Sequence, residues 1–117
     1  MNEKEFNATA WNNGKHHKTG AGYGIKIDEN DRDIFFNREW DYVILYLEGE
    51  KKPGKANIRK KSFWSPTCRE MISKEIGAWL IENEKAPWAK GQPPKLIMTH
   101  INGNQFKVSL NLSANGL

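Results

Sequence analysis

Residues 40–47 read WDYVILYL, and this stretch is the clearest β-strand in the 117-residue chain. Side chains alternate across a strand, so one face carries Val43, Leu45 and Leu47 and the other carries Tyr42, Ile44 and Tyr46. Both faces are apolar or aromatic, a pattern typical of a strand that lies centrally in a sheet or is covered on both sides. The stretch therefore predicts a sheet built around this strand.

Shorter elements lie on either side of this strand. Residues 23–27, YGIKI, alternate well enough for a short strand. Asp28 offers an N-cap for a short helix or turn, which is expected to bury Ile34, Phe35 and Phe36. On the other side, residues 55–63 read as a polar, edge-like strand.

The main helix is expected to begin at Ser65-Pro66-Thr67 and to end by residues 83–85. Apolar side chains recur there at spacings of three and four, as Cys68, Met71, Ile72, Ile76, Trp79 and Leu80. This stripe predicts that Cys68 is a small buried hydrophobe. Gly77 weakens the helix by about 1 kcal/mol relative to alanine.

A hairpin is predicted near the C-terminus, where residues 96–101 and 105–110 flank Asn102-Gly103, a pair favoured in two-residue turns. Pairing Ile101 with Asn104 would place Ile97 opposite Val108. The expected core face of the hairpin consists of Ile97, Phe106 and Val108.

The predicted element order is β-α-β-β-α-β-β, and its hairpins and separated helices indicate an α+β fold with mostly antiparallel strands. The length fits one domain over residues 1–117, in which residues 1–10 and 111–117 are expected to be loose. No run of 18 apolar residues occurs, and the first 15 residues lack an apolar signal core. We therefore expect no membrane association.

One cysteine excludes an internal disulfide framework and a cysteine-built zinc site, and a cytoplasmic setting is expected. No metal is expected, because His16 and His17 are adjacent and His100 lies far along the chain. The glycines of residues 14–24 form neither a GxGxxG motif before a helix nor a P-loop. We expect no cofactor.

Charge is distributed in blocks. Residues 1–50 hold 6 basic and 10 acidic side chains, whereas residues 51–117 hold 12 basic and 4 acidic ones. Two stretches, Phe6–Ile27 and Lys51–Arg69, contain basic residues and no acidic residue. A positive face of this kind attracts polyanions, although a solvated surface is the ordinary alternative.

Each stretch mixes cations with amides and an aromatic residue, so we predict a DNA-binding site made of Asn13, Lys15, His16, His17 and Lys18 together with Lys55, Asn57, Arg59, Lys60, Lys61 and Trp64. Lysine and arginine neutralise phosphates, while asparagine and arginine can read base edges. Alternation would direct Asn57, Arg59 and Lys61 from one face of a strand. An edge strand whose lysines prevent aggregation with other chains is an equally ordinary interpretation.

The element order resembles that of the DNA-binding pseudobarrel family, which includes plant auxin-response-type transcription-factor domains and restriction-endonuclease target-recognition domains. The stretch NNGKHHKTGAGYGIKI, residues 12–27, looks like the arm and strand that open the restriction-enzyme members. KANIRKKSFW, residues 55–64, occupies the place of the second arm. The resemblance implies an open pseudobarrel, two arms that clamp the major groove of double-stranded DNA, and binding without a cofactor.

Two other functions remain open at this point. His16 or His17 with a lysine, or Asp41 and Glu50 followed by Lys51 and Lys52, would suit a small nuclease acting on nucleic acid. A Trp-rich surface that includes Trp88 would suit a protein-interaction module. An enzyme is the less expected of these classes, and no catalytic residue is assigned.

Overall fold

The computed structural model describes residues 4–111, and the protein is α+β as the sequence predicts. Its elements are β1 (Glu5–Asn12), β2 (Tyr23–Ile27), α1 (Glu29–Phe35), β3 (Tyr42–Leu47), β4 (Gly54–Asn57), β5 (Glu70–Ile72), α2 (Lys74–Glu82), β6 (Lys95–Asn102) and β7 (Gln105–Leu110). Compared with the predicted order, β1 and β5 are additional strands. Neither helix in this part of the chain is long and apolar enough to cross a membrane.

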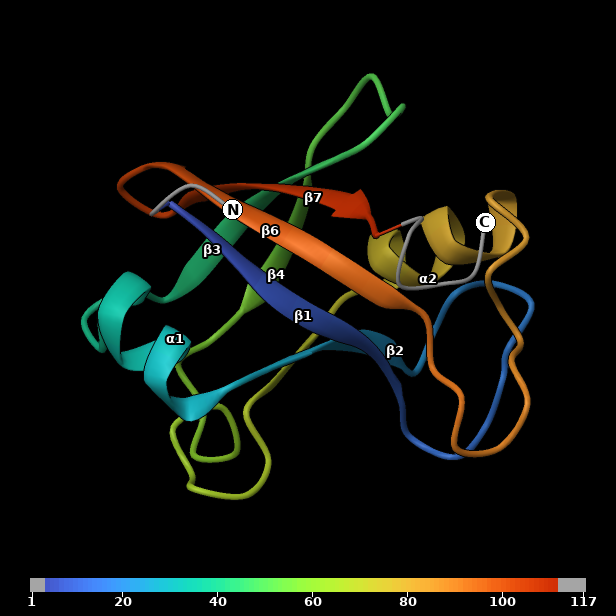
Figure 1. The fold of residues 1–117 in the computed structure, drawn as a ribbon, viewed down its shortest axis with the longest axis horizontal. Coiled ribbons are helices and arrows are strands. Elements are labelled where there is room, and N and C mark those ends of the chain that lie inside the picture. The colour runs from blue at the N-terminus through green and yellow to red at the C-terminus, as the bar shows by residue number, and fades with distance from the viewer. Residues whose placement is uncertain (1–3, 112–117) are drawn as a thin grey trace.

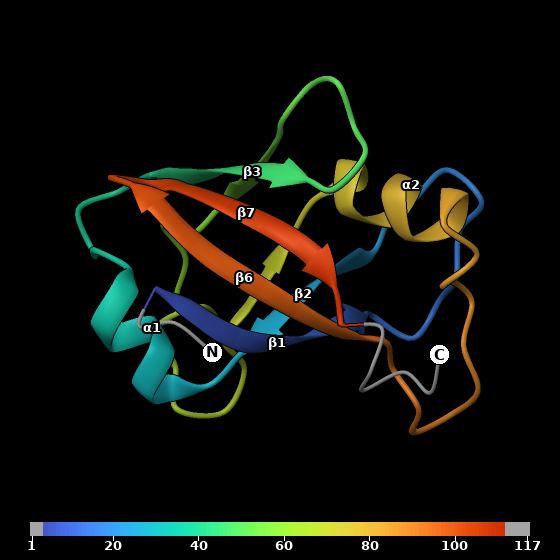
Figure 2. The same cartoon turned by 45° about the horizontal axis from the view of Figure 1, so that its top comes forward.

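The strands form one sheet in the order β4-β3-β7-β6-β1-β2-β5. All neighbouring strands are antiparallel except β3 and β7, which run parallel. The hairpin of β6 and β7 lies in the middle of the sheet, between β3 and β1 (Figures 1 and 2). Side chains of the two end strands, β4 and β5, line one hollow, so the sheet curls into a nearly closed barrel.

The core fills the inside of this barrel. Alternate positions of the strands point inward, among them Phe6, Ala8, Ala10, Ile25, Val43, Leu45, Leu96, Met98, Phe106 and Val108. The helices lie at opposite ends of the barrel (Figure 1). Helix α2 contributes Ile76, Trp79 and Leu80 to the core. Strand β3 has a neighbour on each side but is second from the end of the sheet; only its face of Val43, Leu45 and Leu47 is fully buried, and Tyr46 is exposed.

The N-terminal segment is a paired strand rather than a loose end. Ala8 pairs with Ile27 of β2 on one side and with Leu96 of β6 on the other. The small, alternating apolar side chains of this segment fit a strand held between two neighbours. At the other end, Asn111 still donates its N–H to the Lys95 carbonyl at 3.0 Å, whereas residues 112–117 lie outside the described part.

The main helix is shorter than predicted. Arg69 has a φ of 57°, in the left-handed region that a helix cannot continue through. The next three residues form β5 along β2, where Met71 pairs with Ile25 and is completely buried. Helix α2 therefore begins only after Ser73, and Cys68 lies exposed in the preceding loop instead of on an apolar helix face.

The strand predicted over residues 55–63 ends at Asn57. The N–H of Arg59 donates to the Asn57 side-chain oxygen at 2.9 Å. This local turn directs the backbone away from the hydrogen-bonded sheet. The helix prediction before β3 is also partly wrong. Phe36 is buried, but Ile34 is 71% exposed because it lies on the outer side of α1.

The C-terminal hairpin forms in a register one residue away from the prediction. Asn102 pairs with Gln105, and a bulge lies between His100 and Asn102. Met98, not Ile97, is therefore opposite Val108, and the inward side chains of β6 are Leu96 and Met98. A shift of one residue exchanges the two faces of a strand, so Ile97 is only partly buried.

Candidate nucleic-acid interface

Nine of the eleven predicted site residues lie in two loops, which we call the first loop (residues 13–22, between β1 and β2) and the second loop (residues 58–69, between β4 and β5), whereas Lys55 and Asn57 lie in β4. Strands β2 and β5 are antiparallel, with Gly24 opposite Ile72 and Lys26 opposite Glu70. Each loop leads into the start of one of these strands, so the loops lie at opposite ends of the pair. Figure 1 shows both loops at the lower edge of the molecule, one on each side of β2.

Between the loops lies the outer surface of β1, β2, β5 and β4, which we call the strand face. Residues that alternate with the buried positions point outward here, namely Trp11, Lys26, Ile72, Lys55 and Asn57. Trp11 is directly opposite Gly24, where a Cβ would collide with the Met71 carbonyl oxygen, so glycine at this position permits the close approach of β5. Lys55 and Asn57, both predicted site residues, border a hollow of about 570 Å³ with Ile72. The ammonium of Lys55 lies 3.9 Å from the centre of the Tyr42 ring.

The first loop is shaped by two asparagines, Asn12 at the end of β1 and Asn13. The Asn12 amide donates to the Lys15 carbonyl at 2.7 Å, and its oxygen accepts from the Gly14 N–H at 2.8 Å. The Asn13 oxygen accepts from the Lys15 N–H at 3.1 Å. These turns leave Lys15, His17 and Lys18 exposed. Asn13 therefore holds the loop conformation in addition to any contact with a ligand.

Two glycines fasten the first loop to α2. Gly20 has a φ of 93°, and a Cβ there would lie 2.5 Å from the backbone nitrogen of Ala78. A Cβ on Gly77 would collide with the carbonyl oxygen of Gly20. Gly77, interpreted from the sequence as a weak point of the helix, is thus the residue that allows the loop to approach it.

His16 belongs to an aromatic cluster at the base of the first loop. Its Nδ1 lies 2.5 Å from the Tyr23 hydroxyl. Its ring packs against the Trp88 ring in a T-shaped arrangement, with 5.0 Å between the ring centroids. Tyr23 and Trp88 are also in contact, at 5.6 Å. Burial raises the pKa of Tyr23, so its hydroxyl keeps its proton at neutral pH. The first loop is therefore packed against the segment that carries Trp88.

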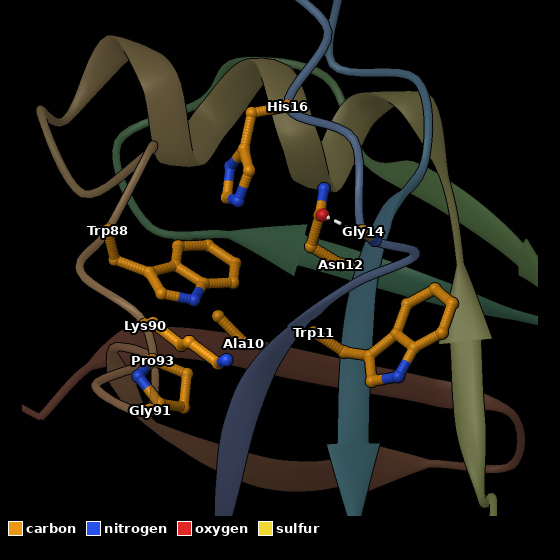
Figure 3. Close-up of a pocket in the computed structure, with 9 residues that line it drawn as sticks. All are labelled: Ala10, Trp11, Asn12, Gly14, His16, Trp88, Lys90, Gly91 and Pro93. Atoms are coloured by element: carbon orange, nitrogen blue, oxygen red, sulfur yellow. Dashed lines mark hydrogen bonds between the residues drawn. The ribbon is translucent and has the colours of Figure 1, made fainter.

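A hollow of about 560 Å³ opens between the first loop and the segment 88–93, and its lining residues are Ala10, Trp11, Asn12, Gly14, His16, Trp88, Lys90, Gly91 and Pro93. Figure 3 shows the Trp88 ring on one side of it, with the Lys90 side chain extending toward Ala10, whereas the Trp11 ring lies on the far side of β1 and points away from Trp88. The predicted site omits Trp11, Trp88 and Lys90. A third acid-free stretch, which begins at Lys85, is the sequence signal that would have pointed to this segment.

Two of the three predicted cations of the second loop, Arg59 and Lys60, are paired or partly buried within the protein. The Arg59 guanidinium lies 2.5 Å from the Asp41 carboxylate and donates to the Glu39 carbonyl at 3.1 Å. Burial lowers the pKa of Lys60, although the nearby Glu70 carboxylate opposes this shift. Lys61 is exposed. Among the predicted cations of this loop, Lys61 therefore combines exposure with no part in the ion pair of Arg59 and Asp41.

Two arginines and Trp64 hold the second loop together. Arg32, which is buried in α1, donates to the carbonyls of Phe63 at 3.1 Å and Ser65 at 2.8 Å. The guanidinium group of Arg32 lies 5.3 Å from the centre of the Trp64 ring, and that of Arg38 lies 4.7 Å from it. The indole N–H of Trp64 donates to the Ile58 carbonyl. Arg69 donates to the carbonyls of Ile27 and Pro66. Trp64 is thus a packing residue of this loop.

The carboxylates considered for a nuclease are not brought together. Asp41 precedes β3 and Glu50 follows it, so they lie at opposite ends of that strand. A hydrogen bond with Glu82, assisted by burial and by the charge of Glu82, raises the pKa of Glu50. Within residues 4–111, no three His, Cys, Asp or Glu side chains gather in a way that could hold a metal ion. The histidine-based nuclease and the protein-interaction module remain predictions.

Comparison of the chain with protein families, with curated proteins and with solved structures finds no match.

Proposed function

We propose that the protein binds double-stranded DNA along the strand face, with the two basic loops at its ends. The observation that carries the proposal is that two cationic stretches, separated by more than one strand and one helix in the sequence, border the same outer surface of β2 and β5. Trp11, Lys26, Lys55 and Asn57 lie on the surface between them. Cations flanking amide and aromatic groups suit phosphate contacts on either side of a base-reading surface.

The dimensions agree with such a complex. Strand β2 has five residues, which corresponds to roughly 17 Å between its two ends. The major groove of B-DNA is about 12 Å wide. Loops at the ends of β2 can therefore reach the phosphates on both sides of one groove. The resemblance to the DNA-binding pseudobarrel family, drawn from residues 12–27 and 55–64, implies the same arrangement of two arms on one groove.

The roles of the site residues differ between the loops. Lys15 and Lys18 of the first loop, with Lys61 of the second, supply exposed charges for phosphates. Asn57 on the strand face and His17 in the first loop are the candidates for base edges. Arg59 can contact a DNA phosphate only if it gives up its ion pair with Asp41. Lys60 can contact DNA only from a half-buried position.

The test is a fluorescence-anisotropy titration of a labelled duplex at several salt concentrations. Each phosphate contact contributes about 0.9 to the slope of log affinity against log salt. Lys15→Gln with Lys18→Gln should therefore reduce the slope by about 2. The control is Lys51→Gln with Lys52→Gln, which removes equal charge from the β3–β4 turn, and this variant should keep the parent slope.

Two results would reject the proposal. One is the absence of duplex binding by the parent protein at low salt. The other is an equal loss of affinity in the two double variants, which would mean that net charge alone, rather than the first loop, attracts DNA.

A further inference from the structure

We infer that the hollow lined by Trp88, His16 and Lys90 accepts one unstacked base from the nucleic acid, with Lys90 placed for the adjoining phosphate. The inference rests on the proposed function and adds to it a second mode of contact, because a fully paired duplex offers no free base to this hollow.

The lining has the chemistry of a nucleotide site. It contains the indole of Trp88, the imidazole of His16 and the ammonium group of Lys90, and none of its nine lining residues is acidic. Aromatic rings stack on any base, and an ammonium neutralises a phosphate. The volume of about 560 Å³ falls within the range of small-ligand pockets. A ligand that is both planar and anionic fits this combination better than a neutral apolar one.

The aromatic wall is held in place before any ligand binds. Trp88 meets His16 at an interplanar angle of 84° and Tyr23 at 64°, and Tyr23 is itself 1% exposed. The His16 Nδ1 is used by the Tyr23 hydroxyl, which leaves Nε2 as the ring nitrogen for a ligand. A wall fixed by such contacts loses little side-chain freedom when a base stacks on it.

Trp11 connects the hollow to the strand face. This residue pairs with Gly24 on the outer side of the sheet and also lines the hollow. The hollow therefore begins where the proposed DNA surface ends, beside the first loop. A nucleotide that leaves the DNA duplex at that point would move from the strand face into the hollow. This favours a base of the bound DNA, rather than a free nucleotide, as the occupant.

The experiment compares three labelled duplexes of otherwise identical sequence: fully paired, with a one-nucleotide adenine bulge, and with the same bulge lacking its base. Stacking of one base is worth about a tenfold gain in affinity. The parent protein should bind the adenine bulge about tenfold more tightly than the paired duplex, whereas the baseless bulge, which keeps only the phosphate contact of Lys90, should gain about threefold or less. Adenosine monophosphate is included as a competitor to test the free nucleotide.

Trp88→Leu and Lys90→Gln should each reduce the preference for the adenine bulge to less than about threefold. Lys90 is exposed, so its replacement leaves the fold intact and keeps the test valid if Trp88→Leu is destabilising. Lys107→Gln, which removes an equal charge from β7, is the matched control and should retain the full preference.

The outcomes separate this inference from the proposed function. Tight binding of the paired duplex without a preference for the adenine bulge, or a preference that survives both substitutions, would overturn the inference alone. Equal affinity for adenosine monophosphate and the adenine bulge would overturn the assignment to a base of the strand. A protein that binds none of the duplexes would contradict both.

Discussion

The first and second loops have similar composition but use their charges differently. In the first loop the side chains of Lys15, His17 and Lys18 extend into solvent, and within residues 4–111 the ion pairs involve Arg32 and Arg59 but none of these three. In the second loop Arg59 is paired, Lys60 is half-buried, and arginines hold the backbone carbonyls. A run of cations in a sequence thus does not distinguish charges offered to a ligand from charges that stabilise a loop.

The largest effect is expected from Arg32→Met, which removes the internal support of the second loop. The carbonyls of Phe63 and Ser65 lose their donor, and Trp64 loses one of its two guanidinium neighbours. Removing a buried charged donor costs about 3 kcal/mol of the free energy of unfolding. Urea denaturation measures this loss. A loss below about 1 kcal/mol would contradict the structural role given to this arginine.

Gly77→Ala tests the attachment of the first loop. Helix propensity alone would stabilise the protein by about 1 kcal/mol, but the new methyl collides with the Gly20 carbonyl oxygen. We expect a net destabilisation of about 2 kcal/mol and weaker duplex binding, because the loop must move away from α2. Ala78→Gly, at the exposed neighbouring position, should cost about 1 kcal/mol without altering DNA affinity. Increased stability of Gly77→Ala would show that the loop is not fixed at this contact.

Asp41→Asn should make the second loop more like the first. Without the carboxylate, Arg59 is released from its exposed ion pair and becomes available for a phosphate. Duplex affinity should rise about threefold in anisotropy titrations at low salt. Asp28→Asn removes the same charge near α1 and preserves the N-cap type, so it should change affinity less. Equal gains in both variants would indicate a general charge effect.

The smallest effect concerns Lys60. Burial lowers its pKa, so the folded protein binds this proton less tightly than the unfolded chain, and the charged side chain opposes folding at pH 7. This opposition decreases as the pH rises toward the ordinary lysine pKa of about 10.4. Lys60→Met should therefore raise the melting temperature by about one or two degrees at pH 7, and by less near pH 10. Lys61→Met, at an exposed position, should give no comparable increase.

Local patterns in the sequence were sufficient for β2, β3 and the N-cap of α1 at Asp28, since each depends on adjacent residues. Pairing partners were not predictable in the same way. Met71 has the spacing of a helix stripe but lies in β5, because Ile25 of β2 offers it a strand partner. The bulge at the β6–β7 turn similarly moved Ile97 off the core face.

For the candidate site, the sequence pointed to the cationic stretches and to Asn57, but it did not indicate which cations are paired. Arg59 meets Asp41 only because β3 and β4 are neighbours. Trp88 and Lys90 were missed as partners of His16 because they are more than 70 residues away and are brought close only by the docking of the first loop on α2. Contacts of that range depend on the complete fold rather than on local composition.

The central position of the last hairpin has a consequence for how the chain is made. During synthesis β3 with β4 and β1 with β2 and β5 can form as two separate groups, but β6 and β7 are the strands that join them. Until β6 and β7 have left the ribosome, β1 and β3 each present an unpaired edge, and such edges promote aggregation. Domain assembly should therefore be a late, all-or-none event rather than a gradual one.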